Sequence, residues 1–168
     1  MRGFTLTELM VTVALLMLMS AMTAIGLQPL QARFQLRLAT GATAQLLVRA
    51  RQRAVETGRC HHVEVLADSA PVRAGATGDT LRVSRRRDAD CESPVDPIAL
   101  VEVERIRLPE RMVVRPQEEG PLVFRPNGRT WDNAAWRFSV GPQDSSRAVV
   151  AAPLGPVCVL DSLEEACP

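Results

Sequence analysis

The spacing of apolar residues divides the chain into three parts. Residues 9–27 read LMVTVALLMLMSAMTAIGL, nineteen residues without a charge, which as a helix rising ~1.5 Å per residue spans roughly the hydrocarbon layer of a bilayer. Further on, apolar and small side chains recur every three or four residues, as on one face of an amphipathic helix. They are Leu36, Ala39, Thr43, Leu47, Ala50 and Ala54. We expect Pro29 to kink this helix and Gly58 to follow its last residue.

After Gly58 the period changes to two, which is typical of half-buried strands. The alternation predicts strands at 61–66, 80–83, 101–103 and 136–140, and shorter ones near 112–114, 122–124 and 148–151. A break in phase at Glu104 and Arg105 predicts a bulge in the third of these. The pattern therefore predicts an α+β fold, in which one long N-terminal helix packs on a mostly antiparallel, β-rich domain.

The amino-acid composition excludes several classes of function. The chain has 168 residues and a formal net charge of +1, with 20 basic and 19 acidic side chains. Such a balance argues against a polycation that binds nucleic acid through bulk charge. All basic residues are arginine, which excludes a catalytic lysine. No nucleophile elbow, phosphate loop or dinucleotide fingerprint appears. We expect no enzyme and no cofactor.

The first residues carry a specific motif. They read MRGFTLTELM and closely resemble the type IV prepilin signal, G-F-T-L-x-E-[LM]. The resemblance implies that a membrane prepilin peptidase cleaves between Gly3 and Phe4 and methylates the new N-terminus at Phe4. A secretory signal peptide is the alternative, but the leader is very short, Glu8 stands at the entrance of the apolar run, and no A-x-A site closes it.

Glu8 has two compatible interpretations. A carboxylate at the head of a membrane helix is costly and usually has a partner. The resemblance implies that this partner is the amine of Phe4 on a neighbouring subunit, which sets the register of assembly. Residues 5–8 also form a capping-box sequence, in which Glu8 would bond a backbone N–H of its own helix.

The segment LVFRPNGRTWDN extends the resemblance to the GspH/FimT family of minor pseudopilins. Phe124, Pro126, Gly128 and Arg129 match the F-x-P-x-G-R pattern of that family in order, whereas residues 155–157 read GPV where the family often has G-R-V. The implied protein is a minor pseudopilin or minor pilin of a type II secretion pseudopilus or type IV pilus. Its partners would be other pseudopilins or pilins, met through the N-terminal helix, and the prepilin peptidase.

The expected organisation follows from these features. Residues 1–3 are the leader, 4–27 a single transmembrane helix in the inner membrane, 28–58 an amphipathic helix and 59–168 a β-rich periplasmic domain. Four cysteines outside the anchor argue for disulfides in an oxidising compartment. Three pairings are possible, and by proximity we expect Cys60 to pair with Cys91 and Cys158 with Cys167.

Two further functions are suggested by particular residues, a metal site and a nucleic-acid interface. Cys60, His61 and His62 suggest a metal site, but neighbouring strand residues point to opposite faces, so we expect no metal and place both histidines at the surface. Because some members of the resembled family take up DNA in natural transformation, a DNA-binding minor pilin is the alternative function. Its possible phosphate contacts are Arg49, Arg51, Arg53, Arg85, Arg86 and Arg87.

Overall fold

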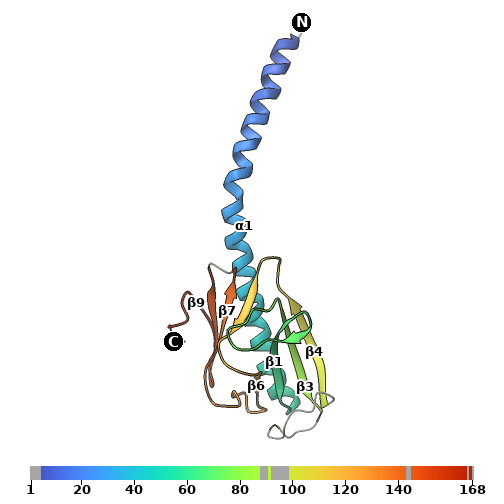
Figure 1. The fold of residues 1–168 in the computed structure, drawn as a ribbon, viewed down its shortest axis with the longest axis vertical. Coiled ribbons are helices and arrows are strands. Elements are labelled where there is room, and N and C mark those ends of the chain that lie inside the picture. The colour runs from blue at the N-terminus through green and yellow to red at the C-terminus, as the bar shows by residue number, and fades with distance from the viewer. Residues whose placement is uncertain (1–4, 88–90, 92–98, 143–144, 166, 168) are drawn as a thin grey trace. The chain divides into compact units, whose positions relative to one another are not determined.

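The computed structural model describes residues 5–87, 91, 99–142, 145–165 and 167, and within its helix the side chains of residues 20–29 are not described. The chain divides into two compact units, residues 1–35 and 36–168. In these described residues, one helix is followed by nine strands (Figure 1). This confirms the predicted α+β class, with a helix packed on antiparallel strands.

Helix α1 (Leu6–Thr57) is continuous across the boundary between the two units. Gly58 follows it with φ +63°, the left-handed conformation that commonly closes a helix. The predicted apolar face is confirmed, because Ala39, Thr43, Leu47, Ala50 and Ala54 are all at most 1% exposed and Leu36 packs against the core. The kink expected at Pro29 lies where side chains are not described and stays a prediction.

The first sheet has the order β2-β1-β3-β4, and β6 pairs with β1 along the edge opposite β3. Its strands are β1 (His61–Ala67), β2 (Ala70–Pro71), β3 (Thr80–Arg86), β4 (Leu100–Arg107) and β6 (Leu122–Phe124). All of its pairings are antiparallel.

A bulge in β4 lies at Val103, one residue before the predicted place. Val83 of β3 pairs with Glu104, whereas the next residue, Ser84, pairs with Glu102, so Val103 has no partner in the ladder. Residues that face each other across a ladder share a face of the sheet. Since Val83 is fully buried in the core, the bulge brings Glu104 to the face that packs on α1.

The second sheet has the order β5-β7-β8-β9 and is also antiparallel. Its strands are β5 (Val113–Pro116), β7 (Trp136–Gly141), β8 (Arg147–Ala151) and β9 (Val157–Leu160). The sequence pattern missed β9 and the two-residue β2. One hydrophobic core joins residues of α1 with both sheets, so the second half of the helix is part of the ectodomain interior.

Candidate assembly segment and ectodomain contacts

The start of α1 is a capping box. The backbone N–H and the hydroxyl of Thr5 both donate to Glu8 Oε2, at 3.3 and 3.2 Å. The Glu8 N–H in turn lies 3.4 Å from Thr5 Oγ1. These reciprocal bonds satisfy backbone donors that a helix start otherwise leaves unpaired. The self-capping interpretation of Glu8 is therefore realised in this structure, and Glu8 still has oxygen lone pairs for a second partner.

Every described side chain from 5 to 19 and from 30 to 35 is exposed. The large apolar ones include Leu9, Leu16 and Met19, which are 59, 66 and 69% exposed. In the part of the chain that the structure describes, no helix meets the length and apolarity needed to cross a membrane. The predicted cleavage and methylation residues, Gly3 and Phe4, lie outside the described residues, and the expected span 4–27 includes residues whose side chains are not described.

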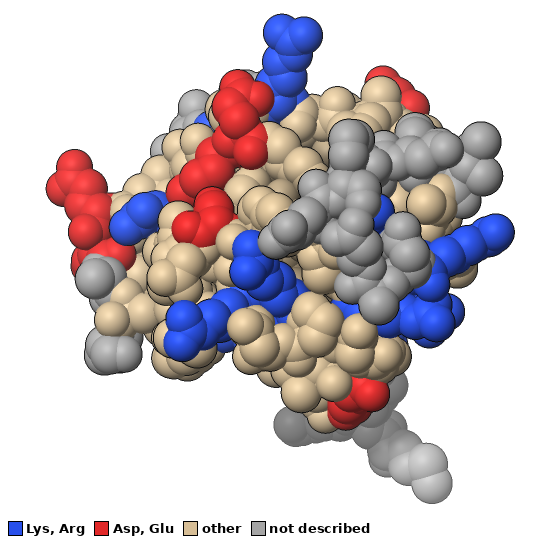
Figure 2. Space-filling view, turned by 90° about the horizontal axis from the view of Figure 1, so that it is seen from below, with Lys and Arg blue, Asp and Glu red and all other residues tan. Residues whose placement is uncertain are grey.

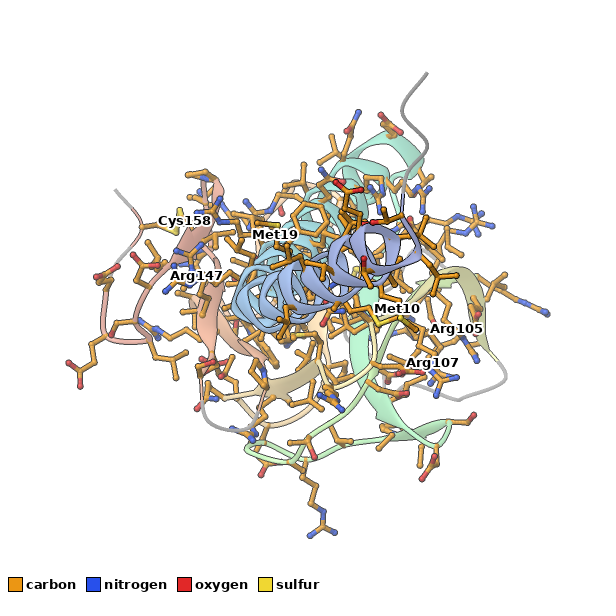
Figure 3. The ribbon with its side chains drawn as sticks, turned by 90° about the horizontal axis from the view of Figure 1, so that it is seen from above. Met10, Met19, Arg105, Arg107, Arg147 and Cys158 are labelled. Carbon is orange, nitrogen blue, oxygen red and sulfur yellow. A yellow bond between two sulfur atoms is a disulfide. The ribbon has the colours of Figure 1, made fainter. Side chains whose placement is uncertain are left out.

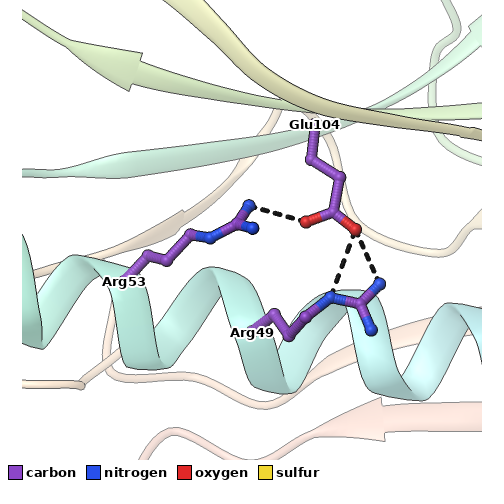
Figure 4. Close-up of polar contacts among 3 residues, drawn as sticks. All are labelled: Arg49, Arg53 and Glu104. Carbon is purple, nitrogen blue, oxygen red and sulfur yellow. Dashed lines mark hydrogen bonds and ion pairs between the residues drawn. The ribbon is translucent and has the colours of Figure 1, made fainter.

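Two of the arginines expected as nucleic-acid contacts instead hold one carboxylate of β4. Arg49 donates from Nε and Nη2 to Glu104 Oε1 at 3.2 and 2.6 Å, and Arg53 donates from Nη1 to Oε2 at 2.6 Å (Figure 4). Burial raises the pKa of Glu104, but the bonds and charges of the two guanidinium groups outweigh it, so the net pKa lies below its ordinary value. This cluster ties α1 to the edge strand of the first sheet.

Arg51 lies on another side of the helix and binds the second sheet. Its guanidinium donates to the carbonyl oxygens of Ala152 and Gly155 in the turn between β8 and β9. It also lies over the ring of Phe124, 5.0 Å from the centroid, in a cation–π contact. Burial lowers the pKa of Arg51. Arg49, Arg51 and Arg53 thus all make contacts within the ectodomain.

The second predicted arginine cluster, residues 85–87 at the end of β3, contains side chains of very different exposure. Arg86 is only 2% exposed, so it cannot present its guanidinium to a nucleic acid, and its expectation as a contact is corrected. Arg85 is half-buried and Arg87 is exposed. Of the six arginines predicted as nucleic-acid contacts, all of which are described, Arg87 alone is exposed.

The two histidines are buried, which corrects the expectation that they lie at the surface. His61 and His62 are 1 and 3% exposed. His61 Nδ1 lies 3.1 Å from the carbonyl oxygen of Arg59, whereas neither ring nitrogen of His62 has a hydrogen-bond partner in the described part of the chain. Burial lowers the pKa of both rings, that of His62 to about 4. Among the described residues, no group of three potential ligands gathers around them or elsewhere to hold a metal.

The cysteines pair as expected from their closeness in the sequence. Cys60 is bonded to Cys91 and Cys158 to Cys167, with Cα–Cα distances of 5.9 and 5.8 Å. Cys158 lies on β9, on the same side of the molecule as Arg147 of β8 and away from Arg105 and Arg107 of β4 (Figure 3). The first disulfide precedes β1 directly, and the second closes the C-terminal segment onto β9.

The sequence pattern did not predict what Arg49, Arg51 and Arg53 contact. Glu104 interrupts the alternation in β4, and that break was a usable signal, because a charged side chain on an inward-facing position needs a partner. The carbonyls that Arg51 binds carry no such signal, because backbone acceptors are present at every residue.

Comparison with known proteins supports the motif and the fold separately. Residues 1–24 match the prokaryotic N-terminal methylation motif. The structure is similar to the type IV minor pilin FimU of Pseudomonas aeruginosa strain PAO1, with a TM-score of 0.55 and 17% identity over 80% of this chain and 94% of that one. A second crystal form of FimU gives a TM-score of 0.51 at 18% identity, over 74% of this chain and 91% of that one.

The same fold occurs in a secretion system protein. The minor pseudopilin EpsH from the Type 2 Secretion System of Vibrio cholerae has a TM-score of 0.54 at 14% identity, over 76% of this chain and 97% of that one. No curated protein matches by sequence. The chain thus combines a match to the methylation motif at its N-terminus with an ectodomain whose fold is similar to those of a minor pilin and a minor pseudopilin.

Proposed function

We propose that the protein is a minor pilin or minor pseudopilin, a structural and non-catalytic subunit of a type IV pilus or a type II secretion pseudopilus. The prepilin peptidase removes residues 1–3, methylates Phe4 and leaves the apolar helix attached. The single observation that carries the proposal is the methylation motif at residues 1–24 on a helix that continues into the core of a minor-pilin fold.

The membrane role of α1 is part of this proposal. Residues 9–27 contain no charged side chain, and the described side chains of this stretch are exposed rather than packed in the ectodomain. Exposed apolar side chains in such number need lipid or other apolar helices around them. The inner membrane then holds the anchor, the ectodomain lies in the periplasm, and sister subunits pack against the helix. Two disulfides agree with an oxidising compartment.

Mass spectrometry of the full chain tests processing. Protein from cells with the peptidase should lack Met1, Arg2 and Gly3 and carry a methyl group on Phe4, whereas protein from peptidase-deficient cells should keep the leader. An intact leader in both strains would overturn the proposal.

The proposed role of Glu8 in assembly can be tested separately from its role in capping the helix. Glutamine can replace glutamate in a capping box, so Glu8→Gln keeps the helix start but removes the charge, and Glu8→Ala removes both. If the charge pairs with the amine of Phe4 on a neighbour, both variants should insert in the membrane and fail to enter filaments. Filament incorporation of Glu8→Gln at the normal level would reduce Glu8 to a cap.

The machine that the subunit serves is tested by deletion. Loss of the chain should reduce either surface piliation or the export of folded periplasmic proteins, and the affected process identifies the system. No described contact favours the DNA-binding alternative, because Arg49, Arg51 and Arg53 are held by Glu104 and by carbonyl oxygens. A salt titration of duplex DNA against the full chain in detergent tests it, and affinity that falls steeply with salt would support it.

A further inference from the structure

One face of α1 stays exposed along the ectodomain and carries no charge. The opposite face of this half of the helix is buried in the core, from Ala39 to Ala54. Between Arg37 and Glu56, every exposed residue of the helix is uncharged. Their spacing of three or four residues places them along one side of the helix. Together with the half-buried Gly41 they form what we call the uncharged face: Leu38, Gly41, Gln45, Val48, Gln52 and Val55.

The residue types of this face are unusual for a helix at a protein surface. The side of such a helix that faces water normally carries charged residues, and the end of the molecule seen from below shows both basic and acidic side chains (Figure 2). On the uncharged face, Leu38, Val48 and Val55 are instead 50, 47 and 53% exposed. A group of exposed apolar side chains of this kind marks a contact surface.

The arginines of this part of α1 lie beside the uncharged face. Arg49 and Arg53 are on one flank, bound to Glu104 of β4. Arg51 is on the other flank, bound to carbonyl oxygens in the turn between β8 and β9. These contacts hold the three guanidinium groups against the two sheets, so the face between them keeps its apolar and amide character.

Gly41 leaves a notch in the uncharged face. Glycine is a poorer helix former than alanine, so a glycine inside a helix needs a reason. In the described ectodomain, a Cβ on Gly41 would meet no atom within 4 Å beyond its chain neighbours and the helix backbone. Packing within the subunit therefore does not require glycine here. A closely packed neighbouring helix does, because the absence of a side chain lets two helix backbones approach each other.

The position of the face along the chain favours a protein partner over lipid. In the proposed topology the bilayer surrounds residues 9–27, and about 30 Å of helix separate Leu27 from Val48 at ~1.5 Å per residue. The headgroup layer extends only about 5–8 Å beyond the hydrocarbon. The three-to-four residue spacing also continues back in the sequence through Phe34 and Leu30, which are 62 and 60% exposed. A partner that follows this line outward from the membrane is itself a membrane-anchored helix.

We propose that the uncharged face of α1 binds the N-terminal helix of a different prepilin-like subunit outside the membrane, with Gly41 at the closest approach. The inference rests on the proposed function, because only an assembled subunit has such a neighbour. A contact of the face with itself would have two-fold symmetry and close as a dimer, whereas neighbours in a filament are offset along its axis. Gln45 and Gln52 suit the contact, because an amide is less costly to bury than a charge and can bond across the interface.

Incorporation of the full chain into filaments tests the face. Gly41→Leu fills the notch, and Val48→Arg places a charge on the face. Each variant should lower the amount of the chain in filaments sheared from cells at least tenfold, relative to its amount in the membrane, as measured by immunoblotting. Val103→Arg and Val159→Arg change exposed apolar residues of β4 and β9 in the same way. These matched controls should incorporate at the wild-type level.

The stability of Gly41→Leu separates docking from folding. Leucine is a better helix former than glycine and the site is open, so the detergent-solubilised variant should be at least as resistant to denaturant as the wild type. A variant that is folded and stable but missing from filaments has lost a contact with a neighbour. Normal incorporation of both variants, or an equal loss in the two controls, would overturn the proposal.

Photocrosslinking in intact cells identifies the partner. With p-benzoylphenylalanine in place of Val48, mass spectrometry should find the adduct on the N-terminal helix of another prepilin-like protein, and in place of Val159 this adduct should be absent. Adducts of the Val48 probe with lipid alone, or with a second copy of this chain alone, would overturn the proposal. If the wild-type chain itself keeps residues 1–3, the proposed function fails. If it is processed and incorporated and the variants are too, only the docking inference fails.

Discussion

The two halves of α1 differ in what surrounds them. From Leu36 onward one face of the helix lies in the ectodomain core, where Ala39, Leu46 and Leu47 are fully buried. In the first half, the described side chains are exposed, and Thr5, Glu8 and Thr12 make hydrogen bonds within the helix itself. The second half of the helix is thus stabilised by tertiary packing, whereas the first half would gain such contacts from the proposed membrane and sister subunits.

Leu47→Ala compared with Leu16→Ala tests this difference most strongly. Removing the buried side chain should lower the free energy of unfolding of the ectodomain by about 2–5 kcal/mol through lost burial and a cavity. Leu16 is 66% exposed, so its truncation should change that value by less than about 0.5 kcal/mol. Denaturant unfolding followed by tryptophan fluorescence measures both, because Trp131 and Trp136 lie in the ectodomain. Equal losses would contradict the comparison.

Acid should destabilise the ectodomain through His62. Its pKa in the folded protein is about 4, below the value near 6.5 of an unfolded chain, so the unfolded state binds the proton first as pH falls. The contribution of neutral His62 is present above pH 6.5 and is lost between pH 6.5 and 4, up to on the order of 3 kcal/mol.

Unfolding curves of the wild type and His62→Gln between pH 7.5 and 4 measure this effect. The variant should show a shallower loss of stability with acid, with the remainder assigned in part to His61, whose pKa burial also lowers. An identical pH slope in the two proteins would remove His62 as the cause.

Glu104→Gln compared with Glu102→Gln tests the cluster on the packed half of the helix. The side chain of Glu104 is 19% exposed and accepts from two arginines, whereas that of Glu102 is 43% exposed and pairs, among the described residues, with Arg105 alone. Loss of the first carboxylate should lower the free energy of unfolding by about 1.5–3 kcal/mol, and loss of the second by about 0–1 kcal/mol. The same loss in both would mean that burial of the pair adds nothing.

The smallest effect is expected at the other end of the helix. Glu8→Gln should change the ectodomain unfolding free energy by less than about 0.5 kcal/mol, because the described hydrogen bonds of the Glu8 carboxylate are with Thr5 in its own cap. Chemical denaturation of the detergent-solubilised full chain checks this. A larger loss would show that the two halves of α1 are energetically coupled.

Local patterns predicted much of the fold. The three-to-four residue period identified the buried face of the helix, and alternation located seven of the strands, because both depend on short-range spacing. β9 was missed because its four residues, VCVL, are apolar without alternation. The site was predicted less well. Burial of the two histidines and the pairing of Arg49 and Arg53 with Glu104 depend on tertiary contacts that no local pattern encodes.

Gly78 joins the two sheets. Its N–H donates to the carbonyl oxygen of Val114 at 2.9 Å, and the Val114 N–H donates back at 2.8 Å. A Cβ at this position would lie 2.4 Å from the carbonyl oxygen of Leu66, so only glycine allows the approach. In the proposed filament, tension carried by the helix would reach both sheets, and the paired bonds between Gly78 and Val114 would resist their separation.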